Sequence, residues 1–488
     1  SVGENLPYRV SLGYTNQQGI IDTSDFKRAT AALNLNPSFF DDHLTLNLNA
    51  KGMWAKSQYA DGAAISAALY YDPTQPVRSD DAKYNNLGGY FQWLSSGTAM
   101  NDSQWPYIYN SQATKNPVSI LDLKDDRAIS RSFIGNAEID YKIHGFEDLR
   151  LHATLGADVS KGTQWTDVSP ASPLAQYYGS HGFDTILKRN LSFNAYAQYY
   201  KDFNDQLKNH LDVMAGYEWQ HFWRSQNNDY VGYYPETNND KSLAGTARPH
   251  TPYKFKTESY LVSFFGRLNY SLLDRYLFTA TVRHDGTSRF KDHWSTFPSF
   301  AFAWKAKEET FLKDVNWLSD LKLRLGYGMT GQQDGGGVGD YSYFPIYKIT
   351  TGTNGFYPIM GNGTFYTPVE YNENLKWETT TTYNAGLDFG FMKNRLTGSV
   401  DWYYRETTDL LNMSKVPAGS NFRNEVISNI GSLKNYGIEA SLDWKAISTK
   451  DWYWTIGYNF TWNKNEITDL TGGSDPNFII PTGGISSG

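Results

Sequence analysis

The residues that could do chemistry in this chain are few and scattered. His284 and Asp285 are neighbours in the segment RHDGTSRF, as the members of an acid–base pair would be. Adjacent residues of an extended strand point to opposite faces, so these two side chains cannot act together directly. The nine histidines are spread along the sequence, and none of them belongs to an HExxH zinc motif. We therefore predict that the chain is not an enzyme.

Two further segments have a composition typical of ligand loops. Thr330–Tyr341 (TGQQDGGGVGDY) is rich in glycine, but it lacks the Lys-Ser/Thr pair and the following helix of a phosphate-binding loop. Asp122–Arg127 (DLKDDR) concentrates carboxylates without the spacing or the glycine of a calcium loop. We predict a flexible extracellular loop and a solvated loop end, and no cofactor, with calcium as an alternative that the spacing does not support.

Aromatic side chains in the long connecting segments are the better candidates for binding. Their rings are apolar on the faces and, in Tyr and Trp, polar at one edge, which suits the capture of a sugar or a peptide. The alternative is that they pack the loops into a compact cap or contact a lid protein. The candidates are Trp93, Trp105, Tyr107 and Tyr109 in the first long segment, Trp165, Tyr177 and Tyr178 in the second, Tyr233 and Tyr234 in the third, and Phe356 and Tyr357 in the fourth.

The composition excludes several classes of protein. The 488 residues include 44 Lys and Arg and 51 Asp and Glu, a net charge of −7, which argues against a nucleic-acid binder with a basic patch. No cysteine is present, so disulfide scaffolds, cysteine-ligated metals and thiol catalysis are excluded. Aromatic residues reach 16%, whereas charged residues make up only 19%, below the roughly 25% of ordinary soluble domains.

Strict alternation of apolar and polar residues predicts the elements that position these side chains. In the segment 452–463, Trp454, Tyr458 and Trp462 share one face with other apolar residues, and Thr455, Asn459 and Asn463 share the other. About fifteen segments show this pattern. Many have about ten residues or more, the length that a tilted transmembrane strand needs and longer than most soluble strands.

The spacing of two tryptophans also fits a membrane. Trp452 and Trp462 are separated by ten positions on one face. That separation is about 33 Å along a strand, or about 25 Å vertically at the tilt of a barrel strand, close to the height of an outer-membrane apolar band. The two rings are thus predicted to lie in the two interfacial girdles.

Connections of alternating length complete the predicted fold. Short turns near His144–Asp148, Ser271–Asp274 and Phe391–Arg395 alternate with long segments, as in an up-and-down barrel with periplasmic turns and extracellular loops. The predicted fold is all-β, an antiparallel up-and-down transmembrane β-barrel; a soluble β-sandwich or propeller is the alternative. The predicted extracellular loops are about 57–125, 161–187, 225–253, 331–375 and 406–433.

The residues resemble those of the SusC/RagA-type TonB-dependent outer-membrane transporters of Bacteroidota. Similar stretches keep their order and spacing along nearly the whole chain, and together they are specific. They are Tyr8–Arg28, Leu272–Phe290, Phe297–Phe311, Leu321–Gln333, Asn372–Phe391, Tyr403–Leu411, Asn429–Trp444 and Trp454–Leu470.

The resemblance implies a larger plugged barrel in the bacterial outer membrane, of which residues 1–488 would supply about fifteen strands. It implies a SusD-like surface lipoprotein as lid, energy from TonB through an N-terminal region, and a pairing of two transporters. The plug domain and the C-terminal closing strands are expected to lie outside this sequence. Arg150, Asp158, Asp212, Glu218, Arg324 and Glu439 are expected to face the lumen, where they line a path or anchor the plug.

The function expected from the resemblance is TonB-dependent import of glycan fragments. Import of oligopeptides is the first alternative, and a receptor or structural barrel that does not transport is the second. An outer-membrane enzyme is a third, which would require distant Ser, His and Asp residues to meet in space. Outer-membrane lipid and a glycan or peptide are the expected contacts, and nucleic acid is not.

Overall fold

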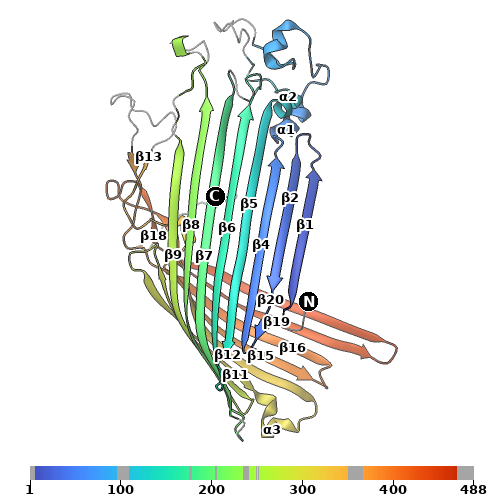
Figure 1. Ribbon diagram of the computed structural model, residues 1–488. Helices are drawn as coiled ribbons and strands as arrows, with labels where there is room; N and C mark the ends of the chain where they lie inside the picture. The colour runs from blue at the N-terminus through green and yellow to red at the C-terminus, as the bar shows by residue number, and fades with distance from the viewer. Residues whose placement is uncertain are drawn as a thin grey trace, which may run out of the picture.

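One large antiparallel sheet makes up most of the structure. The computed structural model describes residues 6–95, 109–110, 112–174, 178–203, 206–234, 241–243, 245–248, 250, 252–349 and 366–469. Fifteen strands follow one another in sequence order, and the short β3 pairs beside β4, which makes a 16-stranded sheet. The sheet curves into an open wall, with the N-terminal strands upright and the C-terminal strands crossing behind them (Figure 1).

The strands are long, as their alternation predicts. The longest are β7 and β8, with 23 residues each. The strands of the main sheet are β1 (Tyr8–Gln18), β2 (Asp25–Leu35), β3 (Ser38–Phe39), β4 (Leu44–Gln58), β5 (Lys124–Lys142), β6 (Leu149–Val168), β7 (Ser180–Asp202), β8 (His210–Gly232), β9 (Tyr253–Leu272), β10 (Tyr276–Thr287), β11 (Trp294–Lys305), β12 (Leu318–Gln332), β15 (Glu378–Phe391), β16 (Leu396–Thr408), β19 (Ser432–Ser448) and β20 (Tyr453–Asp469). These findings confirm the all-β, up-and-down architecture and the number of about fifteen strands.

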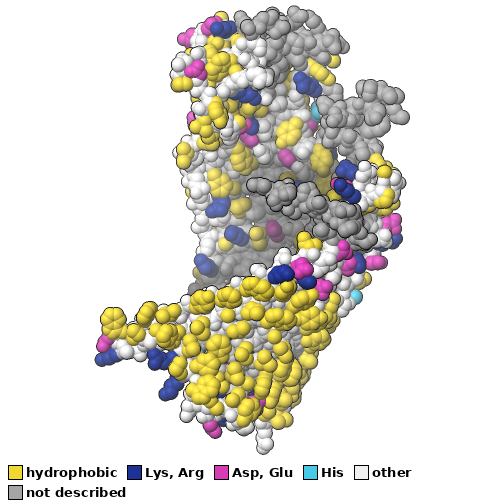
Figure 2. Space-filling view, turned by 180° about the vertical axis from the view of Figure 1, so that it is seen from behind, with side chains coloured by type: hydrophobic (Ala, Val, Ile, Leu, Met, Phe, Trp, Pro, Cys, Tyr) yellow, Lys and Arg dark blue, Asp and Glu magenta, His cyan; other side chains and the backbone are white. Residues whose placement is uncertain are grey.

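Cross-strand register gives the sheet one apolar face. On what we call the outward face, Phe278, Phe302, Leu325, Ala385, Trp402, Ile438 and Trp462 occupy one continuous row across seven strands. Figure 2 shows the broad hydrophobic surface that such side chains form over the C-terminal strands, with the opposite wall visible across a hollow. An apolar convex surface of this kind suits hydrocarbon, and the predicted alternation is therefore confirmed.

A row of tyrosines borders this apolar surface. Tyr327, Tyr383, Tyr404 and Tyr436 lie directly opposite one another on β12, β15, β16 and β19. Their ring centroids are 5.2, 6.5 and 6.4 Å apart. Tyrosine has an apolar ring and a polar tip, so a row of this kind is typical of the membrane–water interface.

Short turns close one end of the wall and long segments lie at the other. At the short end, Leu273 and Asp274 have φ values of 56° and 55°, and Met392, Lys393 and Asn394 have values of 53–59°. Left-handed backbone at consecutive positions matches the right-handed twist of the flanking strands in tight hairpins. The short helix α3 (Thr310–Lys313) lies at the same end (Figure 1). The alternation of connection lengths therefore agrees with the sequence.

The described parts of the long segments at the other end contain helices and hairpins. They contain α1 (Ala63–Tyr70), η1 (Ala82–Leu87), α2 (Pro117–Asp122), η2 (Lys241–Leu243), η4 (Gly335–Gly337) and two small hairpins, β13 (Tyr347–Ile349) with β14 (Tyr366–Pro368) and β17 (Leu411–Lys415) with β18 (Glu425–Asn429). The remaining element, η3 (Ala306–Glu308), precedes α3. In the described part of the chain no helix is both long and apolar enough to cross a membrane.

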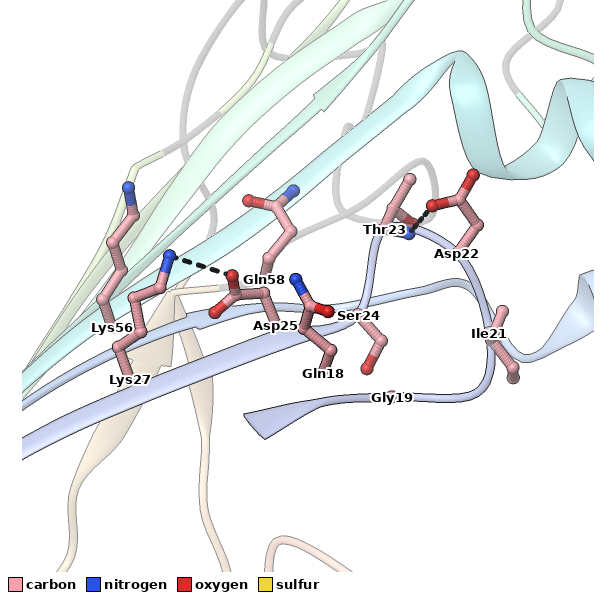
Figure 3. A pocket seen from close by; sticks show the side chains of 10 residues that line it. All are labelled: Gln18, Gly19, Ile21, Asp22, Thr23, Ser24, Asp25, Lys27, Lys56 and Gln58. Atoms are coloured by element: carbon pink, nitrogen blue, oxygen red, sulfur yellow. Dashed lines mark hydrogen bonds and ion pairs between the residues drawn. The ribbon is translucent and has the colours of Figure 1, made fainter. Parts of the chain in front are cut away.

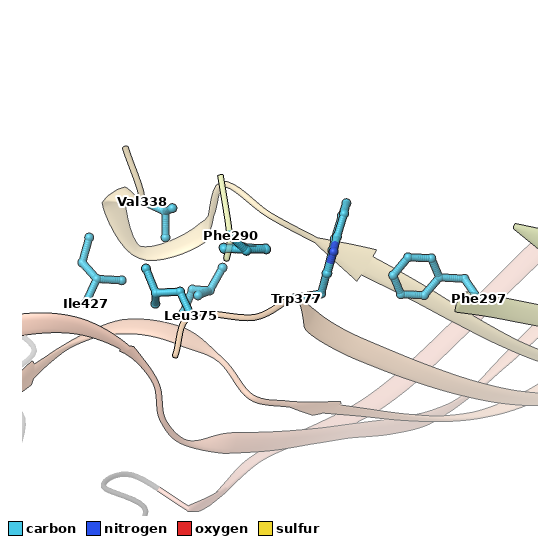
Figure 4. Packing of buried hydrophobic residues seen from close by; sticks show 7 residues of the cluster. Phe290, Phe297, Val338, Leu375, Trp377 and Ile427 are labelled. Carbon is cyan, nitrogen blue, oxygen red and sulfur yellow. The ribbon is translucent and has the colours of Figure 1, made fainter. Parts of the chain in front are cut away.

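A small apolar core joins two of these segments, the β12–β15 and β16–β19 connections, to β11 and the turn that precedes it. Phe290, Phe297, Val338, Leu375, Trp377, Leu411 and Ile427 are buried together (Figure 4). Trp377 contacts Phe290 and Phe297 edge to face, with centroids 5.9 and 5.6 Å apart. The indole N–H of Trp377 also donates to the carbonyl oxygen of His293 at 3.1 Å. Loops with a core of their own hold a fixed shape, as a binding surface requires.

Several strands reach further into the long segments than the alternation indicates. β6 continues to Val168 and β7 begins at Ser180, so most of the predicted loop 161–187 is strand. Similarly, β8 extends to Gly232. Apolar residues such as Trp165, Phe183 and Ile186 are mixed with polar residues in these ends, so their sequence carries no clear period-2 signal.

The assignment of faces predicts that the loss of stability caused by a new charged side chain depends on the face that carries it. Leu155 lies on the outward face, and its neighbour Thr154 lies on the inner face opposite Glu138. We expect Leu155→Arg to lower the free energy of unfolding by about 2–4 kcal/mol, since the charge must enter hydrocarbon. Thr154→Arg should lower the free energy of unfolding by less than Leu155→Arg does. Denaturant unfolding from lipid vesicles measures both values, and equal losses would contradict the assignment.

Candidate functional site

The first long segment builds a cavity at the loop end of the wall. A cavity of about 240 Å³ is lined by Gln92, Trp93, Tyr109, Asn110, Ala113, Thr114, Lys115, Pro173 and Leu174. Trp93 and Tyr109, two of the predicted binding residues, thus meet in one place. We call this space the Trp93 cavity. Its walls combine aromatic rings with the amides of Gln92 and Asn110 and the ammonium group of Lys115.

A buried asparagine holds this cavity in shape. Asn116 caps α2, with its side-chain oxygen accepting from the amides of Val118 and Ser119 at 3.0 and 3.2 Å. Its side-chain nitrogen donates to the carbonyl oxygens of Val77 and Phe91 at 2.7 and 3.1 Å. Because Asn116 is fully buried, these bonds tie the helix to the strand-like segment that carries Gln92 and Trp93.

Two aromatic neighbours fix the indole of Trp93. Tyr71 and Phe91 approach it edge to face, with centroids 5.3 and 5.1 Å away. Tyr109 is almost buried, and its hydroxyl donates to the carbonyl oxygen of Ala171 at 2.9 Å. A preoriented indole loses little rotamer freedom when a ligand stacks on it, whereas Tyr109 mainly supports the wall.

A second, larger cavity lies where the first loop meets the ends of β6, β7 and β8. It measures about 480 Å³ and is lined by Asp122, Leu123, Asp125, Asp167, Val168, Ser169, Pro170, Tyr178, Ser180, His181 and Tyr233. The hydroxyl of Tyr233 lies 3.1 Å from Nδ1 of His181. We call this space the acidic cavity. Tyr178 also packs against the buried cluster of Tyr84, Leu87 and Tyr109, which connects the two cavities.

A glycine shapes the entrance of β7. Gly179 has a φ of +70°, and a Cβ atom there would lie 2.3 Å from the carbonyl oxygen of Val168. Only glycine adopts this backbone easily and permits so close an approach. The turn places Ser180 opposite Val168, and both residues line the acidic cavity together with Tyr178.

Cations and a tyrosine balance the carboxylates of the acidic cavity. Asp122 accepts from the hydroxyl of Tyr90 and, at 3.2 Å, from Arg78. Arg127 lies 3.1 Å from Asp125 and 3.9 Å from Asp167. Burial of the Tyr90 hydroxyl and its hydrogen bond to Asp122 raise the pKa of Tyr90 to about 12. Hydrogen bonds and ion pairs therefore hold these carboxylates in place.

The inner face of the wall carries a different kind of polar group. Arg283 donates to Glu218 at 2.6 Å, to Asp285 at 2.7 Å and to Ser263 at 2.7 Å. Arg324 binds Asp388 in a bidentate manner at 2.7 and 2.9 Å and lies 2.9 Å from Asp401. The arginines of these two clusters are thus neutralised within the wall.

Other inner carboxylates are bound by amides. Asn47 donates to Glu138 at 2.8 Å, and Gln198 donates to Asp212 at 2.8 Å. The register places all six expected lumen residues on the face opposite the apolar rows: Arg150, Asp158, Asp212, Glu218, Arg324 and Glu439. Asp285 also faces inward, whereas His284 stacks outward on Trp294 at 4.8 Å, so the pair is separated as predicted.

Two further predicted binding residues, Trp165 and Tyr234, do not join the two cavities. Trp165 lies within β6, opposite Arg127 and Phe183, rather than in a loop. Tyr234 lies under the guanidinium of Arg248, 5.7 Å from its ring centroid, and lines neither cavity. Trp105, Tyr107, Tyr177, Phe356 and Tyr357 lie outside the described residues.

Sequence reasoning missed the polar half of both cavities. Asp122 and Asp125 belong to the acidic segment that we expected to be a solvated loop end, yet they line the acidic cavity together with Asp167 and His181. The clustering of carboxylates in the segment Asp122–Arg127 was the sequence signal that could have identified the acidic cavity. In the described ranges no group of three or more His, Asp or Glu side chains is arranged to hold a metal ion.

Comparison with known proteins identifies the family. Residues 95–482 match the family model described as TonB dependent receptor-like, beta-barrel. The chain belongs to this family. It is 52% identical over 98% of its length to the TonB-dependent receptor SusC of Bacteroides thetaiotaomicron, and it covers 47% of that protein. It is also 30% identical over 97% of its length to the TonB-dependent receptor P3 of Formosa agariphila, of which it covers 45%.

A solved structure has the same fold. The RagAB peptide importer in its 'closed-closed' state matches with a TM-score of 0.73 at 24% identity, over 98% of this chain and 51% of that chain. The chain therefore spans about half the length of its relatives. The predicted SusC/RagA resemblance and the location in the outer membrane are confirmed, and the relatives are receptors and transporters rather than enzymes.

The hydrogen bond between Tyr90 and Asp122 predicts how the thermal stability of the protein depends on pH. A raised pKa in the folded state means that the bond stabilises the protein fully below the unfolded value of about 10, and that this stability is lost as the pH rises toward 12. The loss of thermal stability caused by Tyr90→Phe should therefore shrink above pH 10. Tyr70→Phe, at an exposed position of α1, is the control, and a pH-independent loss for Tyr90→Phe would contradict this expectation.

Proposed function

We propose that the protein containing this chain imports oligosaccharides across the outer membrane, with energy from TonB. The observation that carries this proposal is the Trp93 cavity, whose lining combines a fixed indole with the polar side chains of Asn110, Thr114 and Lys115 at the loop end of a membrane wall. Sugar rings present apolar C–H faces, which stack on aromatic rings, and hydroxyl edges, which pair with amides and carboxylates. The similarity to SusC supports the same assignment.

The inner face also favours a neutral, hydroxyl-rich cargo. Its two arginine clusters are neutralised by Glu218, Asp285, Asp388 and Asp401. An oligosaccharide needs many weak hydrogen-bond partners along its path. Amides such as those of Asn47, Gln198 and Asn269 supply such partners.

A surface lipoprotein of the SusD type is the proposed lid. The helix α1 buries Ala64 and Ala67 against the loop core and exposes Ile65, Leu69 and Tyr70. Leu69 and Tyr70 are each 78% exposed, which is unusual for adjacent large side chains on a short helix. An apolar surface beside the two cavities is a suitable contact for a protein that closes over captured substrate.

The test is uptake of labelled oligosaccharides by cells that express the full-length protein. Trp93→Ala removes the stacking surface, so half-maximal uptake should require about tenfold more substrate, a loss of about 1.4 kcal/mol. Trp165→Ala is the matched control, because Trp165 lies outside both cavities, and it should leave uptake unchanged.

Two results would contradict the proposal. One is uptake of labelled oligopeptides but not of oligosaccharides, which would favour the peptide importer. The other is equal uptake by the Trp93→Ala and Trp165→Ala variants over a range of oligosaccharides, which would remove the cavity from substrate capture.

A further inference from the structure

The outward face changes from apolar to basic along one edge of the N-terminal wall. Five neighbouring strands each carry an apolar stretch on their outward face. Going along each strand toward the loop end, the first charged or strongly polar outward residue after that stretch is a cation. These residues are Lys27 on β2, Lys56 on β4, Arg131 on β5, Lys161 on β6 and Arg189 on β7. We call them the basic belt. The five strands lie side by side in the wall (Figure 1).

The register brings like charges directly opposite one another. Lys27 pairs with Lys56, and Arg131 pairs with Lys161. Like charges at directly opposed positions of a sheet destabilise it unless an anion lies between them. The arrangement therefore predicts a bound counter-charge at the surface of the wall.

In the described part of the chain, protein carboxylates supply that counter-charge to one residue of the basic belt, Lys27. Lys56, Arg131 and Lys161 are exposed and make no ion pair with the described residues. Arg189 stacks on Trp223, with its guanidinium carbon 5.2 Å from the ring centroid. Lys27 alone has a carboxylate partner, Asp25 at 3.0 Å, and it remains 42% exposed.

One end of the belt is a cavity. A space of about 400 Å³ is lined by Gln18, Gly19, Ile21, Asp22, Thr23, Ser24, Asp25, Lys27, Lys56 and Gln58. Lys27 and Lys56 extend side by side on the same side of the sheet, with Gln58 nearby (Figure 3). Two ammonium groups and two amides around a hollow can bind a phosphate, although the carboxylates of Asp22 and Asp25 limit how closely it approaches.

The belt is confined to one end and one half of the wall. At the short-turn end of the same strands, the outward face carries one cation, Lys201 on β7, and Lys201 is paired with Asp148. At the loop end of β12, β15, β16 and β19, the boundary is the tyrosine row instead. General anchoring at an interface would place basic residues around the whole boundary.

We propose that the basic belt binds the phosphate groups of an anionic lipid in the outer leaflet, the leaflet at the loop end of the barrel. The belt lies just beyond the apolar band, at the depth of the lipid headgroups, and basic side chains there attract anionic lipid. Arg131 contributes a planar fork that matches a phosphate, and the lysines contribute point charges. The belt depends on membrane insertion alone and not on the proposed transport.

The test is a binding measurement on the full-length protein in non-ionic detergent. Diphosphorylated lipid A is titrated, and bound lipid is counted by native mass spectrometry. The double variant Arg131→Gln with Lys161→Gln should bind about 30-fold more weakly, from about 1 kcal/mol per basic residue. This difference should shrink at high salt, because the charges are exposed.

Two variants control for folding and for charge. Lys51→Gln with Lys188→Gln removes two cations from the inner face of β4 and β7 and should bind lipid like the wild type. The exchange Arg131→Lys with Lys161→Arg keeps the charge and should also bind. Heat-modifiability on gels shows that each variant is folded.

Four results would overturn the proposal. Unchanged lipid A binding by the Arg131/Lys161 double Gln variant would exclude the belt. If dephosphorylated lipid bound as tightly as lipid A, the phosphate would not be the group that the basic belt recognises. If inorganic phosphate bound as tightly as the lipid, the site would not be specific for a lipid. Loss of a co-purified acidic protein from the double variant, with lipid binding intact, would assign the belt to a protein partner.

Discussion

Hydrocarbon offers no hydrogen bonds, and this constraint determines the rest of the structure. Every backbone N–H and C=O group within the membrane must pair within the protein, which an uninterrupted antiparallel ladder achieves. In the described residues the ladder runs from β1 to β20, and each inner strand pairs on both sides. Side chains alternate between the two faces of such a ladder. One face of the sheet therefore contacts lipid, and the other face carries the polar side chains.

Function is therefore confined to three places. The inner face holds neutralised clusters around Arg283 and Arg324. The loop end holds the Trp93 cavity and the acidic cavity, both supported by buried contacts of Asn116 and Tyr109. The outward face at that end holds the basic belt. Rigid strands carry all three, so the chemistry at each place depends on register as much as on residue type.

The sequence predicts the faces well and the cavities poorly, for a physical reason. Period-2 alternation is local, so the apolar face of the strand with Trp454 and Trp462 can be assigned without a structure. The meeting of Trp93 with Tyr109 depends on the capping of α2 by Asn116, which no spacing reveals. Likewise, the strand that contains Trp165 extends beyond the membrane, where alternation no longer marks it.

The proposed function requires that the loop end faces outside the cell and receives the substrate. Since the chain has no cysteine, single cysteines can be introduced at Lys115, in the Trp93 cavity, and at Lys393, in a short turn. A membrane-impermeant maleimide should label position 115 on intact cells, more slowly with oligosaccharide present, and label position 393 only after the outer membrane is permeabilised. Labelling of position 393 but not of position 115 on intact cells would contradict the account.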